Sequence, residues 1–368
     1  MTDIELGSIC RYRNESVSID QDTYISTESM LPNKAGITQA SSIPEKGKAR
    51  AFYKGDTLVS NIRPYFKKIW QADHNGCCSA DVLVFEPTEC NADYLYWLLS
   101  SDAFFNYMVS TSKGTKMPRG DKGAIMLFKA KRMGIERQKQ IADTLNPIRQ
   151  LIKLNQQTND YLLELAKTRF RELADRDPHK VRLGEIIELE DSKRIPLNSR
   201  DRAERQGPYP YYGAASVMDH VDDYLFDGIR VLLGEDGTVL SEDGHPILQY
   251  VWGKFWVNNH AHVLKAAGSY SLEAVYVALS MVSASELVTG AVQPKINQKN
   301  LYNLVLCMPR DDSLDYLQMI FKNYRNCVDE NRQLESLRDA LLPKLMSGEI
   351  DVSKIELPMQ PNNHLADC

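Results

Sequence analysis

The chain has 368 residues, of which 43% are hydrophobic and 25% charged, and its formal net charge is −5. This length predicts two or three domains, and the composition is typical of a folded rather than a disordered protein. No apolar run approaches the ~20 residues of a membrane span, and the charged N-terminus does not fit a secretory signal. Seven cysteines without a C-x-x-C pair indicate neither a disulfide framework nor a zinc finger. We therefore expect a cytoplasmic protein without a bound metal.

The N-terminal third of the chain contains short β-rich runs followed by a helical pattern. Thr57–Ile62 and Val82–Phe85 are apolar runs of strand length, and Lys54–Asp56 carries a turn signal before the first of them. Apolar residues at helical spacing predict a helix over Asp93–Met108. These elements together predict a mixed α/β domain with an irregular sheet.

Two segments of this first region are strongly basic. Residues 46–68 hold seven Lys and Arg against one acidic residue, and residues 113–139 hold nine against two. Such segments are either solvated faces or places where a polyanion docks. Charge alone leaves both interpretations open.

Two later stretches show the three- and four-residue apolar spacing of a coiled-coil seam. The first starts at Ile141 and the second at Leu317. Two such helices in one chain pair most simply with each other, in antiparallel orientation. Pro147 interrupts the first seam, so we expect a kink or a break there. Asn155 and Asn331 occupy equivalent seam positions, where a buried amide fixes helix register.

The region between these helices resembles the first region in composition. Ile229–Leu233 and Phe255–Val257 are β-rich runs, and a helix is predicted over Ser271–Val288. An acidic block, Asp222–Asp243, surrounds the first of these β-rich runs.

A repeat spans the whole chain. Short strings recur at a nearly constant separation, and these strings are residues 6–9 with 183–186, 80–83 with 261–264, and Pro118 with Pro294. The small drift between these separations predicts duplication of one unit of about 176 residues. The predicted fold class is α+β, with two tandem mixed α/β domains and two long helices paired as an antiparallel coiled coil.

Motifs for catalysis are missing from the sequence. It contains neither a G-x-G-x-x-G cofactor loop nor a G-x-x-x-x-G-K-[ST] phosphate loop. The acidic block is the one candidate for a metal nuclease site, but its composition favours a solvated hairpin. His260 and His262 would share a strand face as a metal pair. Without a third ligand nearby in the sequence, a structural or polar-contact role is favoured. We expect no catalytic residue and no metal site.

Two similar domains held apart by paired helices would read two short half-sites on double-stranded DNA, with an unread spacer between them. Because the two domains have diverged, the half-sites would form a non-palindromic pair. Basic clusters would contact phosphate, and polar loop side chains would contact bases.

At this point the chain resembles the specificity subunits of Type I restriction–modification systems. The resemblance covers nearly the whole length and rests on strings in a characteristic order, which are residues 114–122, 209–214, 221–228, 257–264 and 341–350. It implies two target-recognition domains at residues 1–134 and 178–310. It also implies two helical regions that the family conserves, at residues 135–177 and 311–350, and a flexible tail at 351–368.

The resemblance further implies the function and the partners. Such subunits read a bipartite, asymmetric DNA sequence without catalysing a reaction. They assemble with two adenine-methylating modification subunits, and with restriction–translocation subunits in the full complex. The chain itself would bind no cofactor, because S-adenosylmethionine, ATP and Mg²⁺ would belong to those partners.

Candidate DNA-contacting residues are the Lys, Arg, Asn and Gln side chains of the basic loops in each domain. In the first domain they are Lys67, Lys68, Lys116, Arg119 and Lys122, and in the second Lys254, Gln293, Lys295, Asn297 and Lys299. Arg and Lys suit phosphate or guanine, and Asn and Gln suit adenine. Each of them is also compatible with a merely solubilising role.

Two other classes of protein remain open. One is a self-sufficient nuclease or methyltransferase, which the missing motifs disfavour. The other is a coiled-coil scaffold or transcriptional regulator that has no methyltransferase partner.

Overall fold

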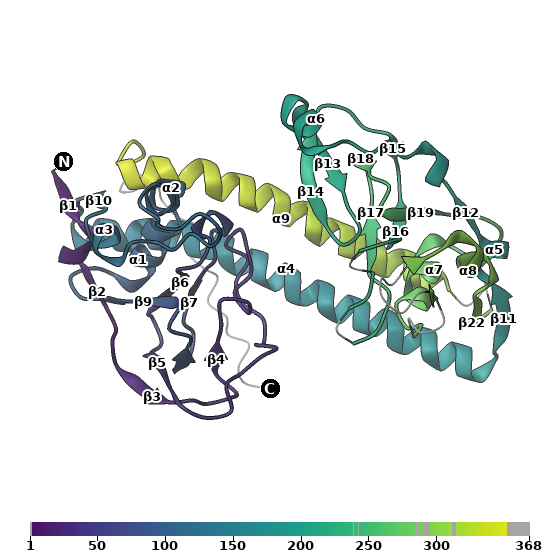
Figure 1. Ribbon diagram of the computed structural model, residues 1–368, viewed down its shortest axis with the longest axis horizontal. Coiled ribbons are helices and arrows are strands. Elements are labelled where there is room, and N and C mark those ends of the chain that lie inside the picture. The colour runs from purple at the N-terminus through teal and green to yellow at the C-terminus, as the bar shows by residue number, and fades with distance from the viewer. Residues whose placement is uncertain are drawn as a thin grey trace, which may run out of the picture. The chain divides into compact units, whose positions relative to one another are not determined.

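The computed structural model describes residues 2–237, 239–241, 243–283, 287–289, 295–310 and 314–351. The chain folds into two units, the first formed by Met1–Leu154 with Glu330–Cys368 and the second by Asn155–Asp329. Two long helices, α4 (Ile135–Arg176) and α9 (Asp315–Ser347), contribute a segment to each unit (Figure 1). Each unit is described below by itself.

The central sheet of unit 1 has four strands, and each neighbouring pair is antiparallel. Their order is β2 (Cys10–Tyr12), β9 (Val82–Pro87), β6 (Thr57–Ser60) and β7 (Ile69–Gln71). Both faces of this sheet are buried, since alternate side chains of a strand point to opposite faces. Val59 and Leu83 join the core with the helices, and Leu58 and Val84 join the core with a second sheet.

The second sheet of unit 1 is smaller and mixed. Its order is β3 (Ser16–Ser18), β5 (Lys48–Phe52), β8 (Gly76–Cys78) and β4 (Tyr24–Ile25). The pairs β3–β5 and β5–β8 are antiparallel, whereas β4 and β8 are parallel. Phe52 and Cys78 of this sheet pack against the central sheet.

Short helices cover the other face of the central sheet. They are η1 (Leu6–Ser8), η2 (Pro64–Phe66), α1 (Ala92–Leu99), α2 (Asp102–Ser110) and α3 (Lys122–Met126). The prediction of one helix over residues 93–108 is wrong. The Ser101 hydroxyl accepts a hydrogen bond from the Phe104 N–H and starts a new helix there. A two-stranded ladder of β1 (Asp3–Glu5) and β10 (Lys129–Lys131) completes the unit.

Unit 2 contains a central sheet with the same strand order as that of unit 1. Its strands are β12 (Ile187–Leu189), β19 (Ala261–Ala266), β16 (Arg230–Gly234) and β17 (Leu248–Val251), and all neighbouring pairs are antiparallel. Helix α7 (Leu272–Leu279) packs against this sheet (Figure 1). The helix predicted here to extend to Val288 ends at Leu279, with Ser280 as its C-cap.

The second sheet of unit 2 has the order β14 (Val217–Val221), β13 (Gln206–Tyr212), β18 (Lys254–Val257) and β15 (Phe226–Asp227). Strands β13 and β18 are parallel, and the other pairs are antiparallel. The remaining elements are β11 (His179–Arg182) paired with β22 (Val305–Met308), β20 (Val288–Thr289) paired with β21 (Lys295–Ile296), α5 (Leu183–Ile186), η3 (Asp191–Lys193), α6 (Ser199–Glu204) and α8 (Gln298–Asn303).

The long helices pack in antiparallel orientation within each unit. In unit 1, Arg137 donates a hydrogen bond to the Ile350 carbonyl, and Asn331 donates one to the Ile152 carbonyl at 3.3 Å. Partner numbers therefore fall along α9 as they rise along α4. In unit 2, Ala166 and Phe170 of α4 are buried with residues near the start of α9, namely Leu317, Ile320 and Phe321. The predicted antiparallel pairing is thus confirmed.

Helix α4 continues through Pro147, so of the two expected outcomes the break is wrong, and the kink stays a prediction. Proline removes one backbone hydrogen bond from a helix. On both sides of it, however, Leu145, Ile148 and Ile152 are buried in the core that α4 shares with α9. This burial holds the helix together across the proline. Helix α9 ends at Ser347 and is followed by Gly348 in a left-handed conformation.

The mixed α+β class with two recognition regions and long helices is confirmed. The identical order of the two central sheets agrees with the predicted duplication. Among the residues that the structure describes, no helix has the length and apolar character needed to cross a bilayer.

Candidate nucleic-acid interface

The basic loop of unit 1 is anchored at the end of strand β6. The backbone groups of Lys113 and Arg119 exchange two hydrogen bonds of 2.9 Å, which closes the loop. The backbone of Arg119 also pairs with that of Ile62 as an isolated antiparallel β-bridge, and the Gly120 N–H donates to the Asn61 carbonyl. The loop that carries Lys116 and Arg119 is therefore fixed at the C-terminal end of β6, an inner strand of the central sheet.

Several predicted DNA-contacting cations of unit 1 lie on or beside this anchored loop. Arg119 forms an exposed ion pair with Asp81 at 3.1 Å, and Lys67 forms one with Asp102 at 2.9 Å. Such exposed pairs are weak and open readily to a phosphate. Lys116 and Lys122 are exposed, and their ammonium groups have no ion-pair partner among the described residues. They are available for an anionic ligand.

Lys68 differs from the other predicted residues of unit 1. Its ammonium group donates a hydrogen bond to the Thr27 carbonyl at 2.8 Å. Burial lowers the pKa of Lys68 below its ordinary value. The Lys68 side chain therefore holds the loop around Thr27 in place, which is a structural role.

In unit 2 the equivalent loop is anchored in the same manner. The Ile296 N–H donates to the Glu235 carbonyl at 3.0 Å, at the end of strand β16. Lys295 forms an ion pair with the Glu235 carboxylate at 3.5 Å. Asn297 caps α8, because its side-chain oxygen accepts a hydrogen bond from the Asn300 N–H. Lys299 is exposed on α8.

The other two candidates of unit 2 lie elsewhere. Lys254 is on strand β18 of the second sheet, with its ammonium 4.5 Å from the centre of the Tyr224 ring. Gln293 lies outside the residues that the structure describes. The structure thus brings Lys295, Asn297 and Lys299 to one segment of unit 2.

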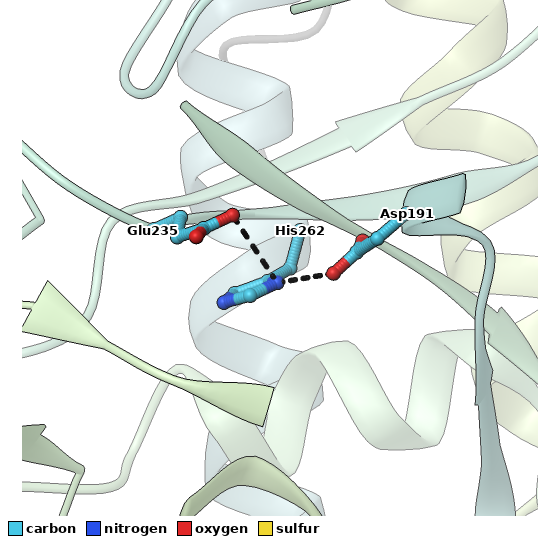
Figure 2. Close-up of side chains that lie close together, drawn as sticks. All are labelled: Asp191, Glu235 and His262. Atoms are coloured by element: carbon cyan, nitrogen blue, oxygen red, sulfur yellow. Dashed lines mark hydrogen bonds and ion pairs between the residues drawn. The ribbon is translucent and has the colours of Figure 1, made fainter. Parts of the chain in front are cut away.

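A buried polar cluster fixes this segment to the sheet. Figure 2 shows His262 between Asp191 and Glu235, with Nδ1 at 2.6 Å from the first carboxylate and 3.8 Å from the second. The Nε2 atom lies 2.8 Å from the Ile296 carbonyl oxygen. Both ring nitrogens of His262 thus lie within hydrogen-bond distance of oxygen atoms from other segments of the chain.

Two acidic residues, Asp191 and Glu235, offer potential ligand atoms within 4.8 Å of His262, and His260, its partner in the predicted metal pair, is not part of this group among the described residues. These two acids are distant in sequence, which hid them. Cations already lie beside both carboxylates, because Arg194 is 2.9 Å from Glu235 and 3.6 Å from Asp191, and Lys295 also pairs with Glu235. A metal would have to compete with these cations and with the hydrogen bonds of the ring for the same ligand atoms. The polar-contact interpretation of His262 is therefore the one that the geometry supports.

The pKa of Asp191 reflects the same cluster. Burial by itself raises the pKa of this carboxyl group, but hydrogen bonds from His262, the Val263 N–H and Gln298 outweigh it. The pKa consequently lies below its ordinary value. Asp191 is ionised at neutral pH and holds the β19 strand and the start of α8 together.

The rest of the acidic block does not gather around this cluster. Asp222 pairs with Arg205 at 2.9 Å, and Asp236 forms a close pair with the exposed His260. Glu242 lies outside the described residues. Among the described residues, only Glu235 of the block belongs to a group with potential metal ligands.

An arginine on α4 attaches the recognition region of unit 1 to the helix. Arg149 donates to Gln71 at 2.8 Å, lies 4.0 Å from Asp93, and stacks 4.5 Å from the centre of the Tyr96 ring. Asn146 donates in turn to Asp93 at 2.9 Å. Strand β7, helix α1 and helix α4 are thereby joined by one polar network.

An arginine on α9 does the same in unit 2. Arg325 forms an ion pair with Glu273 at 3.4 Å and a close hydrogen bond to the Tyr250 hydroxyl. That hydroxyl donates to Glu273 at 2.7 Å, and burial raises the pKa of Tyr250. Arg149 and Arg325 are separated by the same offset as the repeated prolines of the sequence. Sequence reasoning missed both arginines, although this matched spacing was visible in the sequence.

The two seam asparagines are buried as expected for their positions. Asn155 and Asn331 are 7% and 9% exposed. The hydrogen bond of Asn331 to Ile152 links the helices within unit 1. Their role in helix register stays a prediction.

The fold and these loops define a class of protein with two tandem α/β regions built on one scaffold, each with an anchored loop beside its central sheet. Residues 176–322 match the family described as the Type I restriction modification DNA specificity domain. A crystal structure of a Type I restriction–modification S subunit from Mycoplasma genitalium covers 94% of this chain and 96% of its own, with a TM-score of 0.54 and 15% identity. That likeness shows the fold.

Specificity subunits from two organisms are similar in sequence. The chain is 30% identical over 127 residues to a putative type I restriction enzyme specificity subunit of Haemophilus influenzae. This alignment covers 34% of this chain and 32% of that protein. It is also 21% identical over 308 residues to the MjaIX specificity subunit of Methanocaldococcus jannaschii. That alignment covers 72% of this chain and 70% of the relative. The alignment thus spans about a third of the Haemophilus relative. Residues 176–322 thus match the specificity-domain family, and the chain is similar to Type I restriction enzyme specificity subunits, as its resemblance indicated.

Proposed function

We propose that this chain is the non-catalytic, sequence-reading subunit of a Type I restriction–modification complex. Each unit would bind one short half-site of an asymmetric, bipartite sequence in double-stranded DNA. The observation that carries this proposal is that both units have a central sheet of the same strand order, with a loop anchored at the end of the equivalent strand, β6 or β16. This loop is rich in Lys and Arg in unit 1 and poor in them in unit 2. A shared scaffold with diverged loops suits two different half-sites.

Partner subunits would supply the chemistry. Two adenine methyltransferase subunits would bind S-adenosylmethionine, and restriction–translocation subunits would use ATP and Mg²⁺ in the full complex, which we expect in the cytoplasm. Exposed apolar side chains on α4 support docking of a helical partner. Leu151 and Leu154 are 37% and 57% exposed in unit 1, and Tyr161 and Leu165 are 76% and 56% exposed in unit 2. Such side chains on a solvent face are typical of a protein-binding surface.

A genome-wide map of adenine methylation tests the proposal. Cells carrying the chain with its neighbouring methyltransferase are compared with cells lacking the chain. We expect a bipartite motif with an unread gap that disappears without the chain. Absence of any chain-dependent methylation would contradict the proposal and favour the scaffold or regulator class.

Incubation of the pure chain with DNA, Mg²⁺ and S-adenosylmethionine separates the proposal from the enzyme class. We expect neither cleavage nor methylation until the modification subunits are added. Methylation by the chain alone would identify it as a self-sufficient enzyme.

The salt dependence of DNA binding tests the basic loop of unit 1. Replacing Arg119 and Lys122 by Ala should weaken binding, and it should flatten the slope of log K against log salt by about 2. The matched control is Lys139→Ala with Lys153→Ala, which removes the same charge from the exposed surface of α4. Equal slopes of log K against log salt for the two double variants would show that this loop does not contact DNA.

A further inference from the structure

Backbone strain is concentrated at one place in the molecule. Among the described residues, four that are not glycine adopt a positive φ, and these are Asn33, Lys34, Arg63 and Lys67. L-amino acids avoid this conformation, and where they keep it the surrounding structure has to enforce it. All four lie in two loops of unit 1.

The two strained loops hold each other through backbone hydrogen bonds. The Asn33 N–H donates to the Phe66 carbonyl at 2.8 Å, and the Lys34 N–H donates to the Lys67 carbonyl at 3.0 Å. We call residues 63–67 the Arg63 turn. The Arg63 N–H donates at 2.8 Å to the Pro118 carbonyl, which belongs to the anchored basic loop. The turn is therefore rigid and adjoins the basic loop.

The Arg63 turn presents side chains that a purely structural turn does not need. Tyr65 and Phe66 are 50% and 37% exposed, with ring centres 4.8 Å apart. Arg63 has no carboxylate partner in the described structure, and its buried Nε has no hydrogen-bond acceptor. On the adjoining loop, Met117 is 46% exposed. An unpaired guanidinium thus stands beside an exposed aromatic pair and the cations of the basic loop.

Unit 2 differs at this same place in its sheet. The turn lies between the third and fourth strands of the central sheet, β6 and β7. The corresponding connection, between β16 and β17, begins with Glu235, which pairs with Arg194, and Asp236, which contacts His260. The two units therefore have equivalent strands here, β6 with β7 and β16 with β17, and differ in the residues that connect them. Elements that read different half-sites are expected to differ in this way.

We propose that the Arg63 turn is a base-reading element of the first recognition domain, with Arg63 contacting a guanine in the major groove. This inference rests on the proposed function. The planar guanidinium fork matches the O6 and N7 acceptors of guanine, and exposed aromatic side chains suit the thymine methyl group. Lys116 and Arg119 would hold the adjacent phosphates. The strain is retained because it fixes the direction of the arginine.

The decisive variant is Arg63→Gly, because glycine accepts the positive φ and removes only the side chain. The full chain is assembled with its modification subunits, and duplexes are selected from a randomised pool. We expect unchanged or higher thermal stability, a loss of about 10-fold or more in affinity for the wild-type site, and one degenerate position in one half-site. The other half-site should stay intact.

Asn33→Gly is the matched control, since it relieves the same strain in the facing loop and removes no candidate base contact. It should select the wild-type motif. Arg63→Lys keeps the charge without the fork, so it should lose the guanine preference and keep the salt dependence.

Two results would overturn the inference. One is an unchanged motif with Arg63→Gly, and the other is an equal loss of both half-sites with a lowered melting temperature, which would make the turn structural. If the wild-type assembly selects no sequence, the proposed function itself fails, and this inference fails with it. The wild type alone decides that case, so the two failures are distinguishable.

Discussion

The two halves of the molecule agree in their scaffold and differ at its edges. Both central sheets have one strand order, and both are followed by a helix with a capped start, at Asn91 and at Ser271. The second sheets share a parallel pair flanked by one antiparallel strand. The extra strand, however, lies beside β5 in unit 1 and beside β13 on the opposite edge in unit 2. Divergence is concentrated in the second sheet and the loops, where recognition residues are expected.

The attachment of each recognition region to a long helix shows the same contrast in its chemistry. Arg149 and Arg325 occupy equivalent positions, and each faces a carboxylate in the first turn of a helix, Asp93 and Glu273. In unit 1 the partners are mostly neutral amides and an aromatic face. In unit 2 a buried carboxylate depends on the arginine. The equivalent arginines thus both attach an α/β region to a long helix, but only Arg325 neutralises a buried carboxylate.

The largest expected difference between the halves comes from these arginines. Arg325→Ala leaves Glu273 buried with a single hydroxyl partner, so we expect a loss of about 3 kcal/mol in unit 2. Arg149→Ala leaves the amides of Gln71 and Asn146, which still donate to Asp93, and a loss of about 1 kcal/mol is expected in unit 1. Hydrogen exchange of α1 and α7 reads the halves separately. Lys322→Ala, an exposed change on α9, is the control, and equal losses in both halves would refute the contrast.

The buried cluster around His262 is expected to matter next. Asp191→Asn should lower the free energy of unfolding by about 2 kcal/mol at neutral pH. The folded pKa of Asp191 lies below its ordinary value of 3.8. Its contribution is therefore fully present above that value and is lost as the pH falls through the folded pKa.

Urea unfolding between pH 7 and pH 3 measures this contribution. The gap between wild type and Asp191→Asn should stay constant down to about pH 4 and then shrink. The exposed Asp243→Asn is the matched control and should show no gap. A gap that grows on acidification would contradict the assignment.

A pair of equivalent glycines gives a smaller contrast. A Cβ added at Gly184 would lie 2.6 Å from the Tyr302 ring and 3.0 Å from its carbonyl oxygen, whereas one at Gly7 would lie 3.4 Å from Met126. We expect Gly184→Ala to lower stability by about 1–2 kcal/mol and Gly7→Ala by less than about 0.5 kcal/mol. Thermal unfolding of both variants checks this order. The reverse order would show that the two contacts are not packed as described.

The helix caps should give the smallest effect and no contrast. Asn91 accepts a hydrogen bond from the Tyr94 N–H at 2.9 Å, and Ser271 accepts one from the Ala274 N–H at 3.2 Å. Replacing either by Ala should lower stability by about 1 kcal/mol. A large difference between the two, measured by hydrogen exchange of α1 and α7, would break the equivalence of these helices.

Much of the architecture could be predicted because it follows from local patterns. The seam spacing from Ile141 and from Leu317 placed both long helices, and β-rich runs such as Val82–Phe85 became strands. Failures arose where one side chain overrode a pattern. The hydroxyl of Ser101 ended one predicted helix, and packing against α9 carried α4 through Pro147.

The candidate site was less accessible from the sequence. The basic loop was singled out by charge, and the structure shows how Arg119 and Lys113 close it. Whether its residues contact DNA stays a prediction. Lys68 could not be separated from its neighbours by charge, because its burial against Thr27 depends on a loop 41 residues away.

The sequence by itself determined the period of the repeat, the two paired helices and the strands of the central sheets. These features depend on apolar spacing, which is a local property of the chain. Only the tertiary structure decided the partners of buried polar groups and the left-handed backbone of Arg63. Asp191 meets His262 across 71 residues, and Arg63 is held by the carbonyl of Pro118. Such contacts form only when distant segments pack, and no local pattern encodes them.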